Sequence, residues 1–250
     1  MKQLLLITIC ILSFLQADAQ NKMAAASYDK EKLSEIHKCI ATLQDSSSLL
    51  IENLANHSME HDVNSIILDI EKYIDSLPKN KTRADILLNK YFAPLRLFFL
   101  TTTNNTTVAT SFLYTDVPYK FCRYNDTALA LLLGAVKDGN TYDLAKKTER
   151  RIAKAAMETC LLPSLKALDE FKDGELKYVG VSIYYGCKDT REGAPSEPIT
   201  PFCMTLVARL GDIQQYNAGL ITAKGLLTTA EVYLSDADAH ELRRIQMNMD

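Results

Sequence analysis

Apolar residues recur at alternating spacings of three and four from Tyr28 to Leu54, the period of one face of an α-helix. Only one of the seven positions on this face is polar; they are Leu33, Ile36, Ile40, Leu43, Ser47, Leu50 and Leu54. A stripe of this length needs an apolar partner to cover it. The pattern therefore predicts a helix whose stripe is a candidate interaction surface, carried above all by Leu33, Ile36, Ile40 and Leu43.

A second helical stripe follows, but it is out of phase with the first. Its members are Val63, Ile66, Ile67, Ile70, Tyr73, Ile74 and Leu77. The nine residues from Leu54 to Val63 rotate a helix by about 180°, so one continuous helix would place the two stripes on opposite sides. The chain is therefore expected to turn between them, with Ser58 as N-cap and Glu60 and Asp62 in the first helical turn. The prediction is a helical hairpin, ended by Pro78.

A third helix is predicted from a cap at Thr82, with a kink at Pro94. Its apolar positions are Ile86, Leu87, Tyr91, Leu95, Phe98 and Phe99. The polar Thr/Asn tract that follows is a candidate boundary. It divides the chain into a helical region (20–101), a connector (102–107) and an α+β region (108–250), and 28–101 can form one domain with the last region or a separate one.

Strands and helices alternate in the α+β region. Val108–Tyr114 and Tyr119–Tyr124 are expected to form a hairpin, and 126–137 a short apolar helix closed by Asp138-Gly139-Asn140. A long helix is predicted over 143–172, bent at Pro163. Asp138 and Asp143 are expected to be solvated charges that flank these helices.

The last third of the chain is rich in strand patterns. Lys177–Tyr185 and Cys203–Leu210 are predicted strands. Leu226–Leu234 is predicted as a strand, with helix as the alternative, and Ser235 is expected to cap a final helix through Ile245. The predicted class is therefore α+β: an N-terminal helical hairpin plus a third helix, then four to five mainly antiparallel strands with two or three helices.

The N-terminus has the pattern of a cleaved secretory signal at 1–19. Lys2 precedes a twelve-residue apolar stretch, Leu4–Leu15, and Ala17-Asp18-Ala19 supplies a small-x-small site. A helix of that length rises about 18 Å, short of a bilayer core of about 30 Å. We expect an exported protein, periplasmic or secreted, with no stable membrane span after cleavage.

The overall charge balance changes the picture of possible partners. The chain has 28 Lys and Arg against 31 Asp and Glu, a formal net charge of −3. Such a balance supplies no electrostatic reason to bind nucleic acid.

Five of the six cysteines remain after removal of Cys10 with the signal, and their odd number leaves at least one unpaired. Cys187 and Cys203 bracket a turn-rich stretch and are the disulfide candidates, in a loop of about 15 residues worth roughly 3 kcal/mol. In the alternative reading, all five are reduced and buried as small hydrophobic residues.

One short motif points to metal chemistry. His57-Ser58-Met59-Glu60-His61 matches H-x-x-E-H and resembles the motif of the inverted zincins, the insulinase-like peptidases. The resemblance implies Zn²⁺ held by His57 and His61 on one helix, with Glu60 as base toward the metal-bound water. The alternative is a turn with capping acids and no cofactor.

Prolines at every third position mark a second candidate interaction site. Pro195, Pro198 and Pro201 would lie along one edge of a polyproline II helix and could dock in an aromatic groove of a partner. The alternative is a loop that these prolines only stiffen.

Taken together, these patterns predict an exported, non-enzymatic binding or interaction protein with an unknown protein or small-molecule partner and no cofactor. The alternatives are a zinc-dependent hydrolase or peptidase that uses the H-x-x-E-H string and a structural subunit of an envelope assembly.

Overall fold

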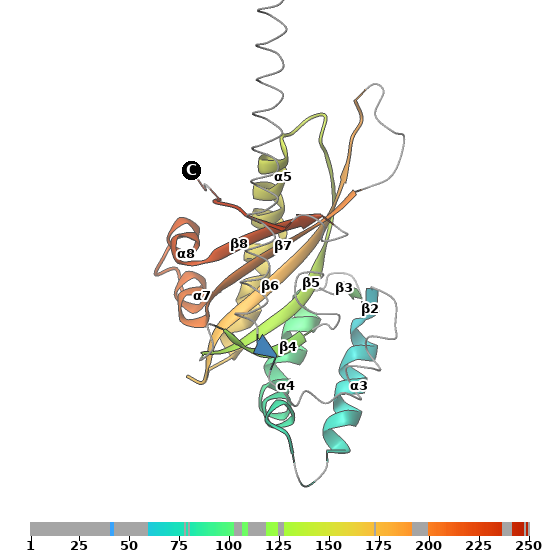
Figure 1. Ribbon diagram of the computed structural model, residues 1–250, viewed down its shortest axis with the longest axis vertical. Coiled ribbons are helices and arrows are strands. Elements are labelled where there is room, and N and C mark those ends of the chain that lie inside the picture. Colours follow the sequence, from blue (N-terminus) through green and yellow to red (C-terminus); the bar gives the residue numbers. More distant parts are fainter. Residues whose placement is uncertain are drawn as a thin grey trace, which may run out of the picture. The chain divides into compact units, whose positions relative to one another are not determined.

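The chain is an α+β protein built on one mixed β-sheet (Figure 1). The computed structural model describes residues 41–42, 60–77, 79, 81–102, 107–109, 119–124, 128–172, 174–191, 200–236, 242–247 and 249. The chain divides into two units, Met1–Lys38 and Cys39–Asp250, and all described residues belong to the second.

Seven strands follow one another across the sheet in the order β1-β4-β5-β6-β7-β8-β9. β3 also pairs with β5, and β2 pairs with β3. Every pairing is antiparallel except that of β5 with β6. The strands are β1 (Ala41–Thr42), β2 (Glu60–Asp62), β3 (Thr107–Ala109), β4 (Tyr119–Tyr124), β5 (Ala128–Asp143), β6 (Leu176–Lys188), β7 (Thr200–Arg209), β8 (Glu231–Asp236) and β9 (Leu242–Arg244).

The parallel pair β5–β6 requires a crossover, and a helical segment supplies it. This segment changes helix type along its length: α5 (Glu149–Ala156), the π-helix η1 (Met157–Leu161), α6 (Leu162–Ser164) and the 3-10 helix η2 (Leu165–Glu170). The π-helix ends at Leu161, two residues before Pro163, whose missing N–H interrupts the regular hydrogen-bond ladder. A change of helix type thus falls next to Pro163, and the bend predicted there stays a prediction.

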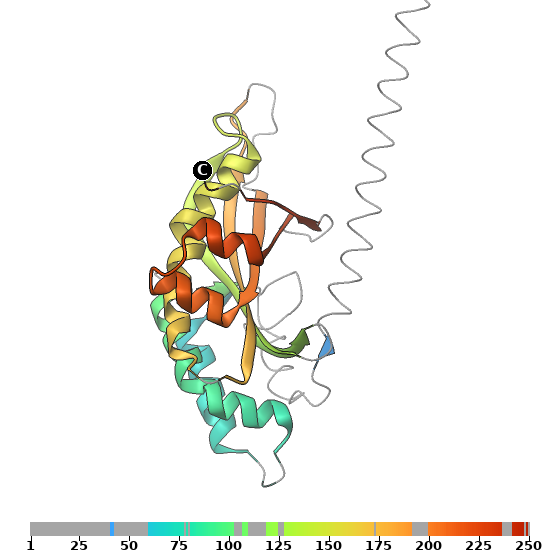
Figure 2. The same cartoon turned by 90° about the vertical axis from the view of Figure 1, so that its left-hand side faces the viewer.

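Helices cover one face of the sheet (Figure 2). Besides the crossover they are α3 (Val63–Asp75), α4 (Arg83–Thr102), α7 (Leu210–Asn217) and α8 (Ala223–Thr229). Alternate residues of β6, from Val179 to Cys187, join a single hydrophobic core with these helices. The period-2 alternation of a strand thus selects which side chains meet the helices.

Among the described residues no helix combines the length and apolar character that a membrane crossing would require.

The predicted second and third helices are confirmed as α3 and α4. Thr82 caps α4 as predicted: its hydroxyl accepts from the Asp85 backbone N–H at 3.2 Å, and its own N–H donates to the Asp85 carboxylate at 2.9 Å. Glu60 and Asp62, however, belong to β2 rather than to the first turn of α3, which begins at Val63. Ser58 lies outside the described residues.

Little of the predicted first helix can be compared with the structure. Of 28–54 only Ala41–Thr42 is described, and these two residues pair with β4 as a strand instead of continuing a helix. The rest of that helix, the signal 1–19 and most of the 102–107 connector lie outside the described residues.

The predicted hairpin of 108–124 is wrong in its pairing. β4 forms where expected, but β3 and β4 lie one after the other along the same edge of β5, at residues 135–136 and 128–133 of that strand.

The predicted helix over 126–137 is also wrong, because these residues belong to the 16-residue strand β5. Leu131, Leu132 and Leu133 are all fully buried. A central strand buried on both faces has the same uninterrupted apolar run as a buried helix, so periodicity does not separate the two. Asp138, Gly139 and Asn140, expected to end the helix, fall where the β5–β6 register shifts.

The predicted long helix begins six residues late, at Glu149 rather than Asp143. Asp143 ends β5 and is buried, so it is not the solvated charge that the sequence predicted. Its carboxylate accepts from the Thr190 hydroxyl at 2.7 Å and from the Ala145 backbone N–H at 3.0 Å. These bonds hold the pKa of Asp143 below its usual value, with the Thr190 bond as the largest cause.

The C-terminal segment differs most from its prediction. β6 and β7 are confirmed, whereas α7 was not predicted. The predicted strand 226–234 divides into the end of α8 and the start of β8, and the predicted final helix contains the strand β9.

The predicted disulfide is not formed between Cys187 and Cys203, both of which are buried. Cys203 pairs with Tyr184 across the β6–β7 ladder, three residues from Cys187. An odd offset sends the two side chains to opposite faces, and three residues of strand separate the Cα atoms by about 10 Å, beyond the reach of a disulfide.

Candidate functional site

Most of the residues that the sequence singled out for binding lie outside the described part of the chain. His57, Leu33, Ile36, Ile40, Leu43, Pro195 and Pro198 are in this group. Pro201 lies in β7 opposite Gly186, so it is part of a sheet rather than of a polyproline helix.

Glu60 and His61 lie in β2, paired with Ala109 and Val108 of β3. The single helix that the H-x-x-E-H interpretation requires is therefore not formed at these two residues. The described residues also contain no group of three or more His, Cys, Asp and Glu side chains placed to hold a metal ion.

A different site forms where α5, α8 and the C-terminal segment after β8 meet. We call it the basic pocket; it has a volume of about 460 Å³. Its lining residues are Arg150, Lys224, Leu227, Thr228, Ala230, Val232, Arg244, Ile245, Gln246 and Met247. Three of these are cationic and none is acidic, so an anion entering the pocket meets positive charge from three separate elements.

Local structure places each of the three cations. Arg150 is the second residue of α5. Lys224 is the second residue of α8, whose N-cap Thr222 accepts from the Gly225 backbone N–H at 3.2 Å. Arg244 lies opposite Tyr233 in the β8–β9 ladder. Regular secondary structure therefore fixes the backbone behind every cationic side chain.

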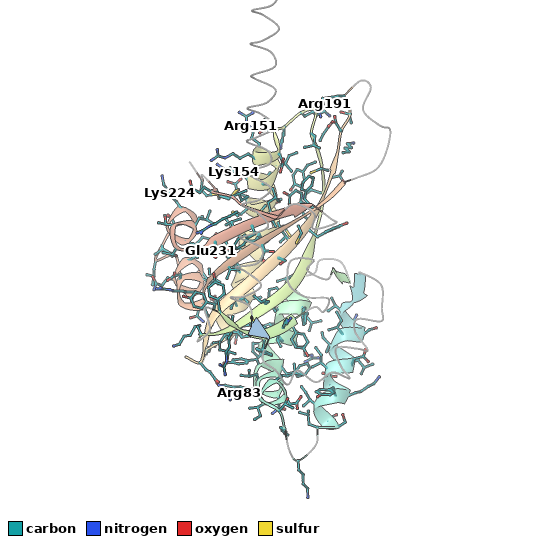
Figure 3. The ribbon with its side chains drawn as sticks, in the orientation of Figure 1. Arg83, Arg151, Lys154, Arg191, Lys224 and Glu231 are labelled. Carbon is teal, nitrogen blue, oxygen red and sulfur yellow. The ribbon has the colours of Figure 1, made fainter. Side chains whose placement is uncertain are left out.

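Arg244 is oriented by a carboxylate that other side chains hold in place. Its guanidinium lies 3.2 Å from one oxygen of Glu231. The other Glu231 oxygen accepts from the hydroxyls of Tyr124 at 2.7 Å and Tyr233 at 2.5 Å. Tyr124 comes from β4, so the contact joins distant strands of the sheet. Figure 3 shows Glu231 on β8 and Lys224 on α8.

Arg150 is the least constrained of the three cations. Its guanidinium donates to the Gln246 carbonyl at 3.4 Å and forms no ion pair with any residue that the structure describes. The side chain is exposed. A guanidinium in this state keeps most of its donors available for a carboxylate or phosphate.

Further basic residues lie near Arg150 along the chain, although none of them lines the pocket. Lys146, Lys147, Arg151 and Lys154 flank Arg150 on α5 and the turn before it, and Glu149 is the one acid among them. Figure 3 labels Arg151 and Lys154 on α5. In the sequence, the string LAKKTERRIAK at 144–154 indicates this local positive charge. The near-neutral net charge of the whole chain averages it with the acidic residues elsewhere.

A second polar cluster centres on two buried residues, Asp138 and Tyr142, and is hydrogen-bonded internally. The Asp138 carboxylate accepts from the backbone and side chain of Asn140 at 3.0 and 2.7 Å and from the Tyr142 hydroxyl at 2.7 Å. Asp138 is thus a buried acceptor rather than the solvated charge that the sequence predicted. The Tyr142 hydroxyl also lies 3.2 Å from that of Thr159, in the π-helix η1.

Three of the described cysteines, Cys122, Cys160 and Cys187, are not activated nucleophiles. Burial raises the pKa of Cys122 and of Cys160 to about 12 and that of Cys187 to about 11. Burial likewise raises the pKa of Tyr142 to about 12. Thiols with these pKa values are protonated near pH 7, and the thiolate is the reactive form. These three thiols are therefore poor nucleophiles near neutral pH, and the basic pocket is the candidate site.

No protein-family model matches the chain, and neither a curated protein nor a solved structure is significantly similar to it.

Proposed function

We propose that this is an exported, non-enzymatic binding protein that holds a small organic anion in the basic pocket. The observation that carries the proposal is the lining: three cationic side chains from three elements and no acidic one. Export is supported by the signal pattern of residues 1–19.

The chemistry of the three cations favours a carboxylate or phosphate group. A guanidinium presents planar paired donors that match both groups, and a lysine adds a point charge. The volume of about 460 Å³ falls in the range of small-molecule sites, about 300–1,000 Å³.

The pocket also has apolar walls. Leu227, Val232, Ile245 and Met247 contribute them. A ligand with an acidic head and an apolar body would bury the body against these side chains, which stabilises binding by about 25 cal/mol per Å². A bare inorganic anion would leave them unused.

Calorimetric titration with hexanoate tests the proposal. We expect hexanoate to bind and hexanol not to bind. Arg150→Gln and Arg244→Gln should each weaken hexanoate binding roughly 10- to 100-fold, since a hydrogen bond to a charged group is worth about 1.5–3 kcal/mol.

Arg151→Gln is the matched control. It makes the same charge change on the next residue of α5, but Arg151 does not line the pocket. Equal losses in Arg150→Gln and Arg151→Gln would show that general surface charge, rather than the pocket, attracts the anion.

A further inference from the structure

Three leucines are exposed together on the helices α3 and α4. Leu68 on α3 is 49% exposed, and Leu97 and Leu100 on α4 are 39% and 47% exposed. Single exposed leucines are ordinary on a protein surface, whereas a contiguous group of them is typical of an interaction site. We call these three side chains the leucine patch. It shares no residue with the basic pocket, so a role for it is independent of the proposed function.

An ion pair between the two helices shows that the leucines are neighbours. α3 and α4 lie side by side and antiparallel (Figure 1), and the Arg96 guanidinium lies 3.8 Å from the Glu71 carboxylate. Leu68 comes three residues before Glu71, and Leu100 comes four residues after Arg96, which are distances of about 4.5 and 6 Å along the helix axes. Because the helices are antiparallel, both displacements run in the same direction. Leu68 and Leu100 therefore lie on the same side of this ion pair, and Leu97 lies one turn from Leu100.

The ion pair gives the leucine patch both signs of charge. The Glu71 and Arg96 side chains are half-exposed, and their contact is longer than a hydrogen bond. A surface pair of this kind contributes little within one chain, so its members can exchange partners at little cost. An anionic membrane would attract Arg96 but repel Glu71. A surface that presents the opposite charges at matching positions satisfies both residues.

A second copy of the chain presents such a surface. In an isologous dimer the same patch faces itself across a two-fold axis, and a residue displaced from the axis meets a different residue of the other copy. We propose that the leucine patch joins two copies of the chain in a symmetric dimer, in which Glu71 of each copy faces Arg96 of the other. The leucines form the apolar centre of this interface, and the two exchanged ion pairs belong to its polar rim.

The size of the leucine patch indicates a weak dimer. Three half-exposed leucines supply only part of the roughly 800 Å² that each partner buries in a standard interface. We therefore expect a dissociation constant of about 10–100 μM.

Sedimentation velocity of the full mature chain, from about 2 μM to about 1 mM, measures this association directly. We expect the sedimentation coefficient to rise from that of a monomer to that of a dimer over this range. Leu100→Glu should weaken self-association at least about tenfold, because it places two like charges at the apolar centre of the interface. Leu220→Glu is the matched control. It introduces the same charge at a leucine that is 75% exposed between α7 and α8, and it should leave the association unchanged.

Charge reversal separates a contact between copies from a contact within one chain. Glu71→Arg and Arg96→Glu should each weaken the dimer, since each variant places like charges opposite one another at both ends of the interface. An equimolar mixture of the two variants should restore association, because each chain then supplies the charges that the other lacks. The pair within each chain remains repulsive in the mixture, so only a contact between copies accounts for the recovery.

Two results would overturn the dimer. The chain would stay monomeric at about 1 mM if the leucine patch served a different protein or a membrane. Self-association that Leu100→Glu and Leu220→Glu weaken equally, or that mixing the charge variants does not restore, would place the contact elsewhere on the surface. Hexanoate binding in the basic pocket is unaffected by either result.

Discussion

Asp85 is a buried carboxylate whose pKa is set by its hydrogen bonds. Burial on its own would raise the pKa, but bonds from the Tyr73 hydroxyl at 2.7 Å and from Thr82 outweigh it and lower the pKa below its usual value. A lowered pKa stabilises the fold above the unfolded-state pKa of about 3.9, and this contribution is lost as the pH falls through the folded-state pKa.

We expect Asp85→Asn to lower the free energy of unfolding by about 1–2 kcal/mol at pH 7. The deficit should narrow below about pH 4, because the wild-type carboxyl is then protonated as well. Urea unfolding at both pH values measures this. Asp75→Asn, at an exposed site on α3, is the control, and a deficit that stays constant with pH would contradict the assignment.

Tyr185 presents the opposite case, a buried hydroxyl with no hydrogen-bond partner in the described structure. Its ring packs against Tyr142 and stacks on Phe202. Burial raises the pKa of this phenol well above its ordinary value.

We expect Tyr185→Phe to raise the free energy of unfolding by about 1 kcal/mol, because it removes a desolvated polar group. Tyr142→Phe is the matched variant and should destabilise by about 1–3 kcal/mol, since its hydroxyl bonds Asp138. Denaturant titrations of both variants measure the difference, and changes of the same sign would refute this account of the two hydroxyls.

At the scale of elements, the type of a helix or strand is predicted best from the sequence where only one of its faces is buried. The apolar residues of α3 and α4 recur with the period of a helix, and those of β6 and β7 recur with the period of a strand. Each of these four elements was predicted. The first half of β5 has no polar face, since Leu131, Leu132 and Leu133 are all buried, so its composition favoured helix.

The central position of β5 gives its core leucines a large share in stability. Leu131→Ala should lower the free energy of unfolding by about 2–5 kcal/mol, as expected for a fully buried leucine. Leu97→Ala on α4, where the side chain is 39% exposed, is the control and should cost far less. Thermal unfolding of both variants provides the measurement, and equal losses would argue against a buried central strand.

At the scale of the whole molecule, the basic pocket depends on residues that are far apart in the sequence. Arg150, Lys224 and Arg244 come from three elements that only the folded sheet brings together. No local spacing marks such a set; residues 226–229 of α8 were predicted first as a strand, with helix as the alternative, and β9 was predicted as a helix. A net charge of −3 excludes a uniformly basic protein but not a basic pocket, because it averages over the whole surface.

The central claim is that this pocket binds organic anions. Its most direct test is the mapping of backbone amide chemical shifts in isotope-labelled protein titrated with hexanoate up to about 10 mM, a range that covers millimolar dissociation constants. The account predicts that the largest shifts fall at Arg150, 224–228 and 244–247, and that Arg150→Gln reduces them. Shifts centred on another surface, or no shifts at all, would contradict it.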